Sequence, residues 1–247
     1  MTLKLIVLFF TPLLSGLLVF LLPGRKSANY RLLLIFAGSY LFSITVIHIL
    51  PELYRQSDGL ELLGLFVLLG FFLQQFLEYF TSGVEHGHLH THKEGGHQGI
   101  PAILLLSALC IHAFLEGAML AQSPGIGQVY DLKAILLGIA LHRAPAAFAL
   151  MTVLAVQLHS RRRAVPSLLI FSLAAPVGLI ISSYLANAAI LSSAGLIYLY
   201  ALVSGNFLHI STTIVFESTP GHKFDGRKFA VAVIGALFAV GIEYVFD

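Results

Sequence analysis

Two stretches of ten residues resemble one another and decide the fold: 111–120, IHAFLEGAML, and 141–150, LHRAPAAFAL. Each lies about halfway along an apolar run that is long enough to cross a bilayer, which takes roughly 20 helical residues. On a helix His112 and Glu116 project from one face because they are four residues apart. If the second helix packs beside the first, His142 reaches the same space. Two imidazoles and a carboxylate are ligands that suit Zn²⁺, so the pattern predicts a metal site within the membrane.

The composition is that of a polytopic membrane protein. Hydrophobic residues make up 57% of the chain and charged residues only 11%, against about 25% charged in soluble proteins. The lipid bilayer is therefore the expected surroundings. Membrane spans nearly use up the 247 residues, which predicts a single transmembrane domain over 1–247. The net charge of +2 argues against a nucleic-acid partner. The single cysteine, Cys110, excludes an internal disulfide and is expected to pack as a small hydrophobe.

The hydrophobic runs predict an all-α fold with eight transmembrane helices. They are expected over residues 3–22, 31–54, 60–82, 100–122, 131–157, 165–187, 192–217 and 227–246. The first run is expected to be a retained span rather than a cleaved leader. Pro51, Pro145 and Pro176 lie inside runs and are expected to kink the helices there.

The distribution of basic residues predicts the orientation. Ten of the 14 lysines and arginines fall in the first, third, fifth and seventh loops. Cytoplasmic loops carry such an excess, so the odd loops are expected in the cytoplasm and both termini outside it.

Other polar side chains inside the spans are few. The candidates for metal ligands along a path are His48, Glu52, Glu78, Asn206, His209 and Glu243. Each also has an ordinary interpretation, because glutamates near span ends can reach the headgroups and His209 can be a hydrogen-bonded packing residue.

A histidine-rich loop is predicted between the third and fourth spans, over residues 83–99. Its imidazoles belong to His86, His88, His90, His92 and His97. Alternating histidines among glycines do not form a core but can bind Zn²⁺, Cu²⁺ or Ni²⁺. The orientation above puts this loop in the cytoplasm. The alternative is a solvated linker with incidental metal affinity.

These motifs together resemble the ZIP family of divalent-metal transporters, across nearly the whole chain. The resemblance rests on 48–52 (HILPE), on 112–117 (HAFLEG), which is similar to the family's HNxPEG, and on 142–148 (HRAPAAF), which is closest to the branch reading HKxPAAF. The resemblance implies uptake of Zn²⁺, and often of Fe²⁺, Mn²⁺ or Cd²⁺, into the cytoplasm. It also implies a transporter rather than an enzyme, with the metal as substrate and without an organic cofactor. An inverted repeat of spans one to three and six to eight would surround spans four and five, and a homodimer is compatible with the resemblance.

The chain departs from the family pattern at the centre. Ala113 and Ala146 stand where two-metal members have an asparagine and a second acid, and Arg143 follows His142. A guanidinium stays charged, would repel a second divalent cation and can pair with Glu116, so one metal is predicted. In the seventh span His209 replaces the family's tyrosine and adds a candidate ligand.

The predicted route starts at an outer mouth, passes the central site, and ends at the histidine loop. The residues in that order are His48, Glu52 and Glu243, then His112, Glu116 and His142, then His209, Asn206 and Glu78. Two alternatives stay open: an intramembrane zinc hydrolase with Glu116 as general base, although the chain lacks HExxH, and a metal sensor or inactive relative without flux. The metal, the coupling ion and the oligomeric state are left open. A cell (inner) membrane is favoured over an organelle membrane.

Overall fold

The computed structural model describes residues 1–21, 28–56, 61–81, 101–121, 132–217 and 225–245. All regular structure in these ranges is helical. The helices are α1 (Thr2–Leu21), α2 (Ala28–Ile44), η1 (Thr45–Ile49), α3 (Leu50–Arg55), α4 (Leu63–Thr81), α5 (Ala102–Met119), α6 (Leu132–Gln157), α7 (Arg161–Asn187), α8 (Ser193–Glu217) and α9 (Gly226–Val245).

The predicted membrane character is confirmed for most of the chain. Seven helical segments of the described residues are long and apolar enough to cross a bilayer by length and composition, and α2, η1 and α3 together form one of them. The eighth predicted span is present as helix α9, which carries the charged residues Arg227, Lys228 and Glu243 and is not one of these seven segments. The chain is therefore an all-α polytopic membrane protein. Eight crossings remain a prediction.

In the second span a turn of π-helix, η1, comes just before the proline. The backbone N–H of Leu50 donates to the carbonyl of Thr45, five residues back, and α3 then begins with Pro51 in its first turn. Proline has no N–H, and a first-turn position needs none. The wider turn places His48 within η1.

Helix α7 begins four residues earlier than the expected residue 165. The Ser160 side chain accepts a hydrogen bond from the backbone N–H of Arg163, which caps the first turn at Arg161. Pro145 and Pro176 lie inside α6 and α7, each of which continues as one helix.

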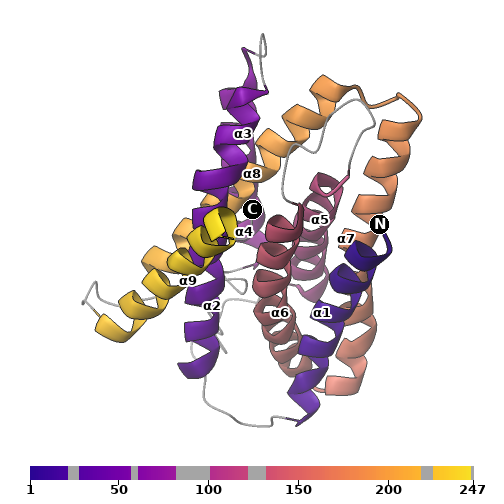
Figure 1. Ribbon diagram of the computed structural model, residues 1–247. Coiled ribbons are helices and arrows are strands. Elements are labelled where there is room, and N and C mark those ends of the chain that lie inside the picture. The colour runs from indigo at the N-terminus through magenta and orange to yellow at the C-terminus, as the bar shows by residue number, and fades with distance from the viewer. Residues whose placement is uncertain (22–27, 57–60, 82–100, 122–131, 218–224, 246–247) are drawn as a thin grey trace.

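The helices fall into two packing groups (Figure 1). In the first group α5 packs on α7 and α1 on α6, with α1 also against α7. In the second group α4 packs on α8 and α2 on α9, with α2 also against α8. One apolar cluster, which includes Leu109, Leu150 and Phe171, is contributed entirely by helices of the first group.

Glycines set the closest helix contacts in each group. A Cβ on Gly117 of α5 would stand 1.9 Å from the carbonyl oxygen of Ala175 in α7, and one on Gly178 would stand 2.1 Å from that of Phe114. In the second group Gly70 and Gly205 make the same kind of reciprocal contact between α4 and α8. Small residues of this sort allow membrane helices to approach backbone to backbone. The two backbones can therefore touch only because these positions are glycine.

Candidate metal centre

His112 and Glu116 occupy adjacent turns of α5, deep inside the first group. Their side chains are 3% and 0% exposed, and Nε2 of His112 lies 3.2 Å from Oε1 of Glu116. The contact follows from the four-residue spacing on a helix, as predicted.

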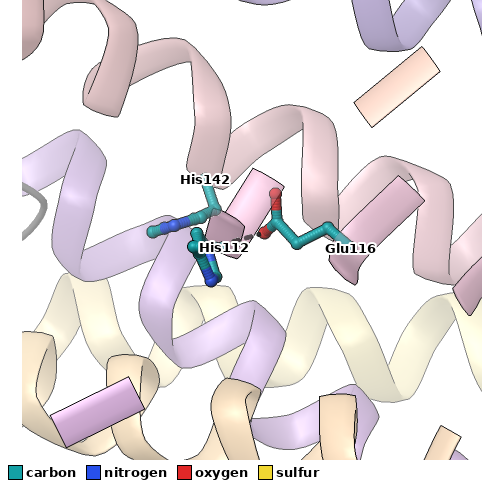
Figure 2. A group of neighbouring side chains, drawn as sticks. All are labelled: His112, Glu116 and His142. Atoms are coloured by element: carbon teal, nitrogen blue, oxygen red, sulfur yellow. Dashed lines mark ion pairs between the residues drawn. The ribbon is translucent and has the colours of Figure 1, made fainter. Parts of the chain in front are cut away.

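His142 of α6 joins them, because α5 and α6 belong to the same group. One ligand atom from each of His112, Glu116 and His142 lies within 4.8 Å of the other two. The two imidazole rings meet edge to face, with 5.8 Å between their centroids. Figure 2 shows the Glu116 carboxylate pointing toward both rings. Among the described residues, these three form the group of histidine, cysteine or acidic side chains whose ligand atoms are close enough together to hold a metal ion.

The three ligands match a zinc site with an open position. Zn²⁺ takes nitrogen and carboxylate ligands at about 2.0–2.2 Å in a tetrahedron, which puts neighbouring ligand atoms roughly 3.3 Å apart. The His112–Glu116 separation already has this value. The ligand atoms of all three residues lie within 4.8 Å of one another, so the three side chains could hold one ion between them. A fourth position stays available for water or for the next ligand along a path.

Arg143 of α6 lies against the same carboxylate. Its Nη1 is 3.4 Å from Oε2 of Glu116, and its Nη2 donates to the carbonyl of Phe171 in α7 at 3.1 Å. The guanidinium carbon also stands 4.8 Å above the Phe171 ring. Arg143 is 1% exposed. The predicted pairing of Arg143 with Glu116 is therefore present, whereas nothing in the sequence indicated Phe171.

Four of the other predicted ligands lie in the second group and form two pairs. Nδ1 of His48 in η1 is 2.6 Å from Oε1 of Glu243 in α9. Nδ1 of His209 in α8 is 3.5 Å from Oε2 of Glu78 in α4, and the His209 ring packs edge-on against Phe71.

Glu52 and Asn206 do not belong to either of these pairs. Glu52 contacts Arg55 and accepts from Gln56 at the end of its own span. Asn206 of α8 is fully buried, and its amide atoms have no hydrogen-bond partner among the described residues. The five loop histidines lie outside the described residues.

Comparison with known proteins decides the family. The family model described as ZIP zinc transporter matches residues 84–243, which include the central site and most of α9. The chain belongs to the ZIP family. ZIP proteins are transporters, which confirms that this chain is not an enzyme and removes the hydrolase alternative.

Named relatives agree with this membership. The chain is 30% identical to zinc transporter ZIP9-A of Xenopus laevis over 174 residues, 66% of this chain and 56% of that protein. It is 33% identical to zinc transporter ZIP9 of Macaca fascicularis over 143 residues, 52% and 60% of the two chains. ZIP9 of Micropogonias undulatus is 30% identical over 166 residues, 64% and 52%. The chain thus spans between half and two thirds of the length of these relatives.

Proposed function

We propose that this ZIP protein carries divalent transition-metal ions, Zn²⁺ foremost, into the cytoplasm through the His112–Glu116–His142 site. The observation that supports this most strongly is the convergence of three metal-ligating side chains from two apolar helices at a fully buried position. Buried polar groups in a membrane are costly and are found where a substrate passes. Fe²⁺, Mn²⁺ and Cd²⁺ suit the same ligands and are secondary candidates.

The charge at the centre favours one ion held transiently. Glu116 is the carboxylate of the site, and Arg143 places a fixed positive charge against it. A second divalent ion would therefore meet repulsion without an additional acid. Weak binding suits transport, because a tight site would retain the ion.

The pairs in the second group are proposed as stations before and after the centre. The first station comprises His48, Glu52 and Glu243, and the second comprises His209, Asn206 and Glu78. His48 and Glu243 come from different helices, as do His209 and Glu78, so a moving helix would change either station. The loop histidines would receive the ion last.

The packing pattern supports the proposed inverted repeat. In such a repeat α1, α2 and α4 correspond to α7, α8 and α9, and α5 corresponds to α6. Under this correspondence the α4–α8 contact is equivalent to the α9–α2 contact, and the α5–α7 contact is equivalent to the α6–α1 contact. These are the four most extensive helix contacts among the described residues. Alternating access by movement of one helix group against the other fits this arrangement.

The chain would act as a single domain with both termini outside the cytoplasm. A cell membrane and a homodimer remain predictions from sequence.

The test is uptake into sealed proteoliposomes that hold a fluorescent metal indicator. Wild-type protein should admit Zn²⁺ and Cd²⁺, and His112→Ala and Glu116→Ala should each abolish uptake. Cys110→Ala is a matched control, because Cys110 lies on the same helix outside the ligand cluster.

Two results would overturn the proposal. Uptake that survives both ligand substitutions would place the path elsewhere. Zinc binding without uptake, lost in the same variants, would favour the metal sensor.

A further inference from the structure

The buried negative charge of Glu116 must be compensated in any transport cycle in which the site returns across the membrane without a bound metal. Its carboxylate is fully buried. An unpaired buried charge is strongly unfavourable, whereas one with a close, well-held partner is tolerated. A carrier with an uncompensated acid would return only when another cation occupied the site.

The two oxygens of Glu116 face different partners. Oε1 lies 3.2 Å from His112 on the side of the ligand cluster, and Oε2 lies 3.4 Å from Nη1 of Arg143. A metal bound through Oε1 therefore leaves the contact with Arg143 in place.

Arg143 is held by groups other than Glu116. Its Nη2 donates to the Phe171 carbonyl, and its guanidinium stacks over the Phe171 ring. Neither contact uses a ligand atom of His112, Glu116 or His142. Glu116, Arg143 and Phe171 come from α5, α6 and α7, all in the first packing group, so the charge partner stays beside the carboxylate when that group moves.

The central charges cancel in the empty site. The carboxylate of Glu116 and the guanidinium of Arg143 carry opposite unit charges and lie 3.4 Å apart, so each compensates the other when no metal is bound. We infer that Arg143 acts as a built-in counter-cation that lets the empty transporter return without a co-ion, so that the chain performs net uniport of the metal rather than obligatory exchange. The inference rests on the proposed transport function and adds its mode of coupling.

The experiment compares two fluxes of Cd²⁺ in proteoliposomes at equal pH on both sides. Net uptake is measured with no metal inside, and exchange is measured with equal Cd²⁺ on both sides and an isotope outside. Wild-type protein should show both. Arg143→Gln should lower net uptake at least tenfold relative to exchange, because only the loaded site can then move readily. Arg143→Lys keeps the charge and should retain net uptake.

Each other outcome has a distinct meaning. Wild-type exchange without net uptake would overturn uniport. Net uptake and exchange that fall together in Arg143→Gln, or that both stay unchanged, would overturn the counter-cation role. Loss of net uptake in Arg143→Lys with exchange retained would show that side-chain shape matters rather than charge. Absence of both fluxes in the wild type would instead overturn the proposed function.

Discussion

At the residue scale, the site follows from helical spacing and the identity of a few side chains. The four-residue interval predicted that His112 and Glu116 would meet, and the similarity of the second stretch predicted that His142 would join them. The contact of Arg143 with Phe171 could not be predicted, because it uses a main-chain carbonyl and an apolar ring. Such partners have no signature in a sequence of many phenylalanines.

The number of metals at the centre is a prediction at this scale. Protein in which the five loop histidines are replaced by alanine should bind one equivalent of Cd²⁺ that depends on Glu116, because the positive charge of Arg143 beside this carboxylate repels a second divalent ion. Replacing Glu116 by glutamine should weaken that binding by roughly 100-fold or more, since loss even of groups around ligands costs 10–100-fold. Equilibrium dialysis measures both quantities. Two equivalents in this background that are both lost in Glu116→Gln would contradict the one-metal account.

At the scale of elements, hydrophobic run lengths predicted the helices well and their ends less well. The π-helical turn before Pro51 depends on a backbone hydrogen bond and the cap before Arg161 on a hydrogen bond to the Ser160 side chain, and hydrophobic periodicity reports neither. His48 and Glu243 were predicted together at the outer mouth, but their direct contact could not be predicted, since the two residues are 195 positions apart.

The link between η1 and α9 predicts a stability effect. Glu243→Gln weakens a short, mostly buried contact with His48, so the free energy of unfolding should fall by about 1–3 kcal/mol. That loss lowers the midpoint of thermal unfolding by a few degrees in a chain of this size. Glu61→Gln, at an exposed carboxylate before α4, should leave the midpoint unchanged. Equal midpoints for both variants would show that the pair contributes nothing to stability.

At the scale of the whole molecule, two helix groups are each held by glycine contacts. The sequence predicted the membrane class and the order of the helices, yet it did not indicate which helices touch. The packing of α5 on α7 depends on Gly117 and Gly178 facing backbone atoms of the opposite helix, which becomes visible only when the helices are paired.

This packing predicts the cost of adding one methyl group. Gly117→Ala puts a Cβ against the Ala175 carbonyl, so α5 and α7 must separate and stability should fall by about 1–3 kcal/mol. Gly241→Ala, where nothing lies within 4 Å, should be neutral or stabilise its helix by up to about 1 kcal/mol. Thermal unfolding in one detergent compares the two variants. A stable Gly117→Ala protein with full uptake would contradict the close contact.

The orientation is a second prediction for the whole molecule. In a Cys110→Ala background, a cysteine at Gln157, before the loop of three arginines, should be protected from an impermeant maleimide on intact cells. A cysteine at Ser192, in the next connection, should be labelled. Both positions are exposed in the structure. The reverse labelling pattern would invert the topology and with it the proposed direction of the path.

The most direct measurement for the central claim is anomalous diffraction from crystals soaked with Zn²⁺ or Cd²⁺. The account predicts one peak between α5 and α6, for Zn²⁺ within about 2.0–2.2 Å of ligand atoms from His112, Glu116 and His142. Two central peaks would contradict the one-metal site. Binding sites elsewhere along the chain, with this centre left empty at saturating metal, would contradict the central claim itself.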